Sequence, residues 1–231
     1  MSEITPAEWT AILLSLRVAV IATLVATPFG IALAWLLARR EFWGKSILDA
    51  AVHLPLVLPP VVTGYLLLLT FGRRGLVGAW LADHLGIVFA FRWTGAALAC
   101  GIMSFPLLVR PIRLSIEAID RRLEQASSTL GAAPWQVFAT VTLPLALPGV
   151  LAGMVLGFAK AIGEFGATIT FVSNIPGETQ TISSAIYSLI QTPDGDAAAL
   201  RLVVVSAIIA IAALIGAEMF ARRATQRLHG N

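Results

Sequence analysis

The chain alternates long apolar stretches with short polar connections, and this pattern predicts its elements. The hydrocarbon core of a bilayer is about 30 Å thick, so a helix needs roughly 20 predominantly apolar residues to cross it. The stretches of sufficient length are residues 11–38, 52–72, 93–112, 146–172 and 199–221. We therefore predict an all-α, polytopic membrane protein with five transmembrane helices.

Two of the connections have features of their own. Residues 76–91 are apolar but contain Asp83, His84 and Gly86, which favours a short interfacial helix over a sixth span. Residues 173–198 carry turn-forming residues and acids between the last two spans. They predict an external loop that is either an ordered surface for a soluble partner or a plain connector.

Composition supports a membrane protein. Of the 231 residues, 58% are hydrophobic and 13% are charged, whereas soluble domains have about 45–50% apolar and about 25% charged residues. Since no segment is polar enough to form a soluble domain, residues 1–231 are predicted to form a single transmembrane domain. The net charge of +3 does not indicate nucleic-acid binding, because the basic residues flank apolar runs. Cys100 is the only cysteine, which excludes an internal disulfide.

The distribution of basic residues predicts the orientation, because Lys and Arg gather on the cytoplasmic side of membrane proteins. With the N-terminus outside and the C-terminus inside, the cytoplasmic basic residues are Arg39, Arg40, Lys45, Arg110, Arg113, Arg121, Arg122, Arg222, Arg223 and Arg227. Those left outside are Arg73, Arg74, Arg92 and Arg201. This arrangement places the polar segment 121–145 in the cytoplasm.

The segment 121–145 predicts two short helices joined at a glycine. Leu123, Ala126 and Leu130 recur at a spacing of three or four residues and form an apolar stripe on the first helix. Gly131 follows at a position suited to a left-handed residue that ends a helix, and Pro134 suits the first turn of the second. An apolar stripe that faces water offers a docking surface to a partner, and the alternative is a solvated connector whose amphipathic helix rests on the membrane surface.

The internal spacing of this segment is specific. Gln125, Ala126 and Ser127 are followed after three residues by Gly131, and after nine more by Val141, Leu143 and Pro144. This spacing resembles the EAA loop of bacterial ABC importer permeases, which has the pattern E-A-A, three residues, Gly, nine residues and I-x-L-P. Gln125, Ser127 and Val141 depart from that pattern, and Glu124 stands one position before the family acid. Together with Trp135, these residues are the candidate ATPase-coupling residues.

The resemblance implies a permease of the type I ABC importer class, working with other components. Two copies of this chain would form the pathway as a homodimer in the bacterial cytoplasmic (inner) membrane. Two ABC ATPase subunits would dock on the coupling loops and bind ATP and Mg, so this chain itself would hold no cofactor or metal. A soluble binding protein would deliver the substrate on the external face.

Three further stretches, which begin at His53, Gly163 and Ser188, resemble the molybdate permease branch of this family. That likeness implies import of molybdate by alternating access and a molybdate-binding protein as partner. Sulfate, tungstate or another tetrahedral oxyanion is the alternative substrate. An ATPase-independent membrane channel or scaffold is the alternative from a different class.

Two charged residues lie within the fourth predicted span. Lys160 and Glu164 are one helical turn apart and therefore share a face. Charges at that depth are costly, and they pair or face a bundle interior or a water-filled path. Lys160 therefore either adds positive potential to an oxyanion pathway, tempered by Glu164, or forms an internal ion pair with it.

Proline and glycine mark two other features of the predicted spans. Pro59 and Pro60 break the start of the second span, which makes their region, up to Gly64, a candidate gate or pathway lining. The glycines of residues 149–157 repeat every four positions, which indicates close helix packing within the subunit or across the dimer.

Motifs for catalysis are incomplete in this sequence. Gly44-Lys45-Ser46 resembles the end of a phosphate-binding loop, but residue 39 is Arg where that motif requires Gly. The three histidines are scattered along the chain, and no Ser or Cys nucleophile has a base beside it. Catalysis by this polypeptide, including that of an intramembrane enzyme, is therefore not predicted.

Overall fold

The computed structural model describes residues 4–229, apart from the side chains of residues 217, 218 and 220–229. Its helices are α1 (Pro6–Arg39), α2 (Lys45–Val57), α3 (Pro60–Phe71), α4 (Leu76–Leu85), α5 (Trp93–Glu117), α6 (Arg121–Thr129), α7 (Pro134–Val137), the π-helix η1 (Phe138–Thr142), α8 (Leu143–Ile162), α9 (Gly166–Val172), α10 (Ile182–Leu189) and α11 (Asp196–His229). Within the described part of the chain every element is helical and none is a strand, so the all-α prediction is confirmed. The ends of the predicted domain 1–231, and the side chains of Arg222, Arg223 and Arg227, lie outside the described residues.

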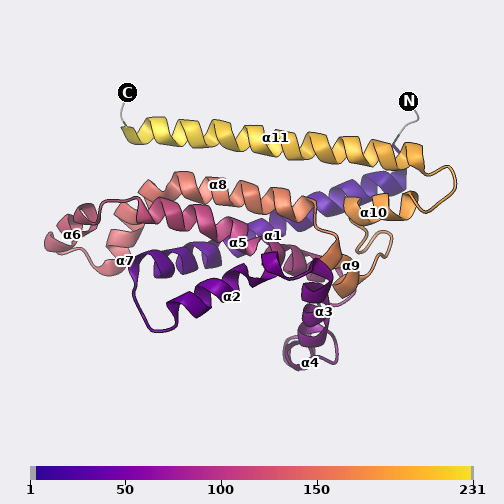
Figure 1. The fold of residues 1–231 in the computed structure, drawn as a ribbon, viewed down its shortest axis with the longest axis horizontal. Coiled ribbons are helices and arrows are strands. Elements are labelled where there is room, and N and C mark those ends of the chain that lie inside the picture. The colour runs from indigo at the N-terminus through magenta and orange to yellow at the C-terminus, as the bar shows by residue number, and fades with distance from the viewer. Residues whose placement is uncertain (1–3, 230–231) are drawn as a thin grey trace.

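The core of the bundle is formed by α1, α5 and α8, and α11 lies along α8 (Figure 1). Glycines of α8 allow its backbone to approach α5 closely. A Cβ added at Gly153 would lie 2.5 Å from the carbonyl oxygen of Leu108, and one at Gly149 would lie 2.7 Å from that of Pro111. The glycines predicted to mediate helix packing therefore do so within the subunit.

The two ends of the bundle carry different segments. The N-terminal end of α1 lies beside α10, and its C-terminal end lies toward α6 and α7 (Figure 1). The helix α10 belongs to the predicted external loop 173–198, and the backbone N–H of Ile182 donates to Ser15 Oγ of α1 at 2.7 Å. That loop is thus an ordered part of the fold. The assignment of this end to the external side stays a prediction.

The predicted second span, residues 52–72, is divided. Among the described residues, four continuous stretches are long and apolar enough to cross a membrane, namely Pro6–Arg39, Trp93–Glu117, Pro134–Ile162 and Asp196–Gly216. Residues 52–72 instead form α2 and α3, which are bent by 113° at Leu58 and Pro59. Proline lacks the N–H that continues a helix and pushes the preceding residue out of the α region. The break predicted at Pro59 and Pro60 is present, and the chain has a fifth span if the bent pair crosses the membrane as one.

The predicted fourth span, residues 146–172, is also divided. Its helix starts earlier than predicted, because the chain runs continuously from Pro134 through η1 into α8, and it ends at Ile162. Residues 163–165 interrupt the helix, and the next helix, α9 (Gly166–Val172), packs against α3 and α5. Hydropathy does not reveal this break, since the residues on both sides of it are similarly apolar.

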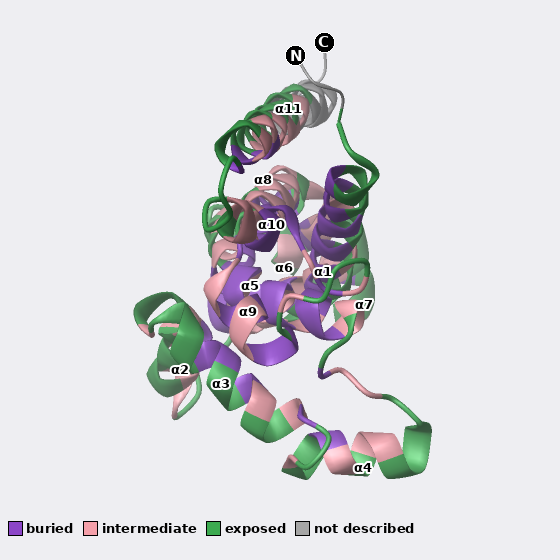
Figure 2. Cartoon of the chain, turned by 90° about the vertical axis from the view of Figure 1, so that its right-hand side faces the viewer, coloured by how far each residue is buried: buried purple, intermediate pink, exposed green. Residues whose placement is uncertain are grey.

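The helices α3 and α4 project from the bundle, and they leave many side chains exposed, as does α11 (Figure 2). The predicted short helix within residues 76–91 is present as α4, which ends at Gly86 in a left-handed conformation with φ of +66°. Its position at a membrane interface stays a prediction. Exposed apolar side chains over these helices suit contact with lipid or with another subunit.

Candidate functional site

The joint between α6 and α7 is built from local backbone contacts around one glycine. Gly131 has φ of +88°, and its N–H donates to the carbonyl of Ser128 at 3.0 Å. The N–H of Ala132 donates to the carbonyl of Ser127 at 3.3 Å. Together these two bonds form a Schellman motif, which satisfies the last carbonyls of a helix when a left-handed residue follows it. The expected helix–Gly–helix element is present.

The second half of the element is continuous with α8. Pro134 occupies the first turn of α7, and the side chain of Gln136 accepts a hydrogen bond from the N–H of Ala133 at 2.8 Å. The chain then widens into η1, a rare helix type that often marks functional sites. Of the predicted coupling residues, Val141 lies in η1 and Leu143 and Pro144 begin α8. A displacement of α7 would therefore pass directly into α8.

Three large apolar side chains are exposed on this element. The side chains of Leu123, Leu130 and Trp135 are 51%, 88% and 71% exposed, and we call these three residues the docking patch. None of the residues of α6 is buried, and Gln125 and Ala126 are exposed as well. Apolar side chains this exposed at the end of a bundle suit a protein partner. The patch thus presents the side chains that a docking surface requires.

Glu124 points in a different direction from the docking patch. Its carboxylate lies 3.0 Å from Arg39 Nε at the end of α1, and Thr142 Oγ1 of η1 donates to it at 2.6 Å. The resemblance to the EAA loop made Glu124, one position before the family acid, a candidate ATPase-coupling residue. In the structure its carboxylate faces other helices of the same chain, and the exposed polar side chain beside it is Gln125.

Lys160 and Glu164 do form an ion pair, with 2.7 Å between Lys160 Nζ and Glu164 Oε2. The Glu164 side chain is only 1% exposed, whereas that of Lys160 is 29% exposed. The other oxygen of Glu164 accepts a hydrogen bond from the N–H of Ala167 at 2.9 Å, in the first turn of α9. Glu164 therefore holds α9 at the break after α8, as a carboxylate at a helix N-terminus does.

The region of Pro59, Pro60 and Gly64 lies against that same helix. A Cβ added at Gly64 would lie 2.5 Å from the carbonyl oxygen of Ala167, and one at Gly166 would lie 2.7 Å from Pro60 Cβ. The bend between α2 and α3 and the break before α9 are therefore in contact. Both the Lys160–Glu164 pair and the region from Pro59 to Gly64 therefore contact α9.

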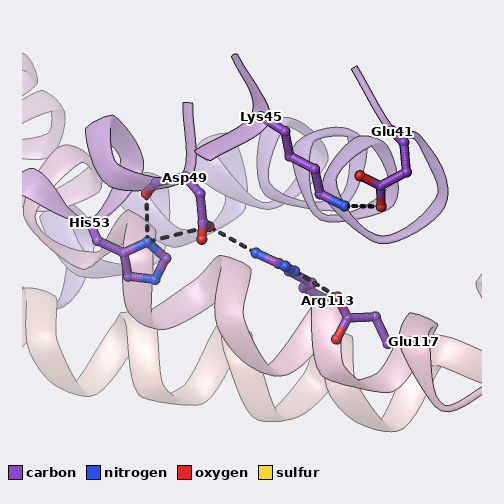
Figure 3. Close-up of polar contacts among 6 residues, drawn as sticks. All are labelled: Glu41, Lys45, Asp49, His53, Arg113 and Glu117. Carbon is purple, nitrogen blue, oxygen red and sulfur yellow. Dashed lines mark hydrogen bonds and ion pairs between the residues drawn. The ribbon is translucent and has the colours of Figure 1, made fainter. Parts of the chain in front are cut away.

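A group of charged residues between α2 and α5 was not predicted. Arg113 of α5 donates from Nη1 to Asp49 of α2 at 2.9 Å and from Nε to Glu117 at 2.8 Å (Figure 3). His53 Nδ1 lies 2.8 Å from the carbonyl oxygen of Asp49, and Lys45 pairs with Glu41 at 2.7 Å. The contact between Arg113 and Asp49 fastens α2 to α5. The four-residue spacing of positions 45, 49 and 53 is a helical stripe on α2, and it is the sequence signal for its part of the group.

No metal site accompanies these residues in the described part of the chain. The side chains described contain no group of three or more His, Cys, Asp or Glu that could hold a metal ion. A cavity of about 650 Å³ lies between α1, α2 and α5, and its walls are apolar side chains such as Val25, Phe29 and Phe105. Of its lining residues, Trp93 and Thr94 carry a side-chain hydrogen-bond donor, so the cavity offers a tetrahedral oxyanion few donors.

Comparison with protein families decides the class of the chain. Residues 26–226 match the family described as "Binding-protein-dependent transport system inner membrane component". The chain belongs to this family. It is therefore a multi-pass protein of the inner membrane, and the family assignment predicted from the spacing of residues 125–144 is confirmed.

Relatives of this family member are similar over nearly their full length. The "Molybdenum transport system permease protein ModB" of Escherichia coli (strain K12) is 58% identical over 224 residues, which cover 97% of this chain and 98% of that protein. The protein of the same name from Haemophilus influenzae is 55% identical over 221 residues, which cover 96% of each.

A solved structure supports the fold. The crystal structure of a bacterial alginate ABC transporter, in complex with an alginate pentasaccharide-bound periplasmic protein, contains a chain that matches with a TM-score of 0.75. The match has 20% sequence identity and covers 96% of this chain and 81% of that one. At this identity the similarity shows the fold, which is that of a chain in an ABC transporter.

Proposed function

We propose that this chain is the permease subunit of an ATP-driven importer that moves molybdate across the cytoplasmic membrane by alternating access. The observation that carries the proposal is the 58% identity to a molybdenum transport permease over almost all of both chains. Sulfate and tungstate share the tetrahedral shape and double negative charge of molybdate, and they are the alternative substrates.

The surfaces of the bundle support the partners that we propose. Two ABC ATPase subunits, which carry ATP and Mg, dock on the docking patches of two copies of this chain, and the chain itself transmits force without hydrolysing ATP. The exposed apolar side chains of α3 and α11 support a homodimer surrounded by lipid. The ordered helix α10 at the opposite end supports an external surface for a molybdate-binding protein.

The intramembrane pathway is proposed to run past Lys160. Because Glu164 is buried and Lys160 is partly exposed, the pair offers its positive end outward and keeps its negative end inside. An oxyanion is attracted to such a charge, and the neighbouring carboxylate limits how tightly it is held. The bend at Pro59 and Pro60, in contact with α9 through Gly64 and Gly166, is the candidate gate.

Uptake into vesicles tests this function. Vesicles that contain the permease, its ATPase and its binding protein are expected to accumulate labelled molybdate only when ATP is supplied on the ATPase side. Unlabelled tungstate and sulfate serve as competitors. Uptake that proceeds without ATP would establish a channel and reject the importer mechanism. Stronger competition by sulfate than by unlabelled molybdate would reject molybdate as the preferred substrate but would leave the importer mechanism in place.

Replacing Leu130 by aspartate is expected to weaken ATPase docking. A central apolar contact of an interface contributes about 2 kcal/mol, so the Kd of the permease–ATPase complex should rise about 30-fold. Binding of the purified ATPase to the purified permease in detergent measures the change.

Ser128→Asp is the matched control, because it adds the same charge to an exposed position of α6 outside the docking patch. It should bind the ATPase nearly as well as the unmodified chain. Equal weakening by both substitutions would show that charge on the loop, and not the patch, determines binding.

A further inference from the structure

Glu124 is the one acidic side chain of α6, and it is held between two other elements. Within its residue span, α6 has no buried residue and packs mainly on η1 and α7. Yet the side chains of Glu124 and Arg39 are only 17% and 9% exposed. A helix that is otherwise peripheral is therefore anchored to the bundle by a shielded ion pair, in which the charges are screened less than at an open surface.

The contacts of this carboxylate join three parts of the chain. Arg39 is the last residue of α1, and it also donates from Nη2 to the carbonyl oxygen of Ile119, just before α6, at 3.2 Å. Thr142 is the last residue of η1, directly before α8. One oxygen of Glu124 lies 3.0 Å from Arg39 Nε and the other accepts the Thr142 hydroxyl. The carboxylate thus connects α6 to α1 on one side and to the start of α8 on the other.

A second contact joins α1 and η1 at the same end. The rings of Trp35 in α1 and Phe138 in η1 meet edge to face, with 6.0 Å between their centroids. This aromatic pair positions α1 beside η1 but does not reach α6. The ion pair of Glu124 is therefore the link that includes the helix carrying Leu123 and Leu130.

We propose that Arg39, Glu124 and Thr142 form a clamp that transmits movement of α6 to α1 as well as to α8. Because α7 continues through η1 into α8, a displacement of α7 moves α8 directly. By contrast, Arg39 of α1 lies 85 residues before Glu124, so α6 can move α1 only through non-covalent contacts. Glu124 is thus a positioning residue for transport, facing inward, and not a contact to the ATPase. The inference rests on the proposed docking of an ATPase at this loop.

The test separates docking from transmission. In the assembled importer, Glu124→Gln keeps the size and one hydrogen-bond acceptor of the side chain but removes its charge. ATPase binding and hydrolysis are expected to stay near those of the unmodified complex, while molybdate transported per ATP hydrolysed falls about 10-fold, as expected for loss of coupling between sites. Glu41→Gln is the control, since Glu41 is an exposed acid whose pKa is lowered by its hydrogen bond to Lys45. It should leave the transport ratio unchanged.

Two additional variants keep the test decisive if Glu124→Gln fails to fold. Thr142→Val removes only the hydrogen bond from the Thr142 hydroxyl to Glu124, and it should lower the molybdate transported per ATP hydrolysed about threefold. Arg39→Glu combined with Glu124→Arg should recover part of the transport per ATP that either substitution alone loses. An unchanged ratio in Glu124→Gln or, if that variant does not fold, in Thr142→Val would overturn the clamp. So would a loss of ATPase binding by Glu124→Gln, which would make Glu124 a docking residue. If the unmodified permease binds no ATPase, the proposed function fails and the clamp fails with it.

Discussion

Glu164→Ala is expected to destabilise the permease by about 3–5 kcal/mol, the usual cost of breaking a buried ion pair by removing one partner. The substitution leaves the Lys160 ammonium without the carboxylate that lies 2.7 Å away. It also removes the acceptor for the N–H of Ala167, so the first turn of α9 loses its carboxylate partner. The yield of monodisperse protein in detergent and the midpoint of its thermal unfolding measure the loss.

A double substitution separates the structural role of this pair from transport. Lys160→Met combined with Glu164→Gln removes both charges, and the amide oxygen still accepts from Ala167. Replacing both members of a buried pair is often nearly neutral for stability, so this variant should fold. If Lys160 lines the oxyanion pathway, the folded variant should not transport molybdate. Normal uptake would leave the pair with a purely structural role, and failure of the double variant to fold would contradict the expected neutrality.

Gly64→Ala is expected to be the most disruptive single methyl addition at the candidate gate. The added Cβ would lie 2.5 Å from the carbonyl oxygen and 2.9 Å from the Cα of Ala167, so the clash is with backbone that cannot rotate away. Overpacking of this kind costs about 3 kcal/mol at the upper end of its usual range. Because α3 must move away from α9, both thermal stability and molybdate uptake should fall.

The neighbouring glycine at the end of α8 provides the control. A Cβ at Gly163 would find its nearest atoms, the carbonyl oxygens of Ala159 and Lys160, at 3.9 Å, which is ordinary contact. Gly163→Ala should therefore change stability by less than about 0.5 kcal/mol. Equal stability of the two variants would show that α3 and α9 are not in close contact in the assembled importer.

The coupling element could be predicted well because its structure is local. The N–H groups of Gly131 and Ala132 end α6 by donating to carbonyls three and five positions before them, respectively, and Pro134 starts α7 through its own fixed φ. Both effects operate within a few residues, so a single sequence contains the information they need. The family was predicted from the same segment, because the spacing of its residues follows from the lengths of the two helices and from the point where the chain returns to the membrane.

The interruptions of the spans could be predicted only in part. Pro59 and Pro60 indicated a break, but the angle of 113° depends on where α3 packs, which is against α9. The end of α8 at Ile162 had no comparable signal, because Gly163 is tolerated inside apolar helices and the residues beyond it remain apolar. Here the hydrogen bond of Glu164 to Ala167 helps to hold the separate helix, and no periodicity reports such a bond.

The sequence by itself determined the class of the protein, its long apolar helices and the helix–Gly–helix loop, because hydropathy, turn chemistry and residue spacing act over short distances along the chain. Only the tertiary structure decided which way the polar side chains of these elements face. Gln125 and Glu124 are adjacent in the sequence, yet one is exposed and the other is held by Arg39, 85 positions earlier. Such a contact depends on how distant helices pack, and the local pattern of residues does not contain it.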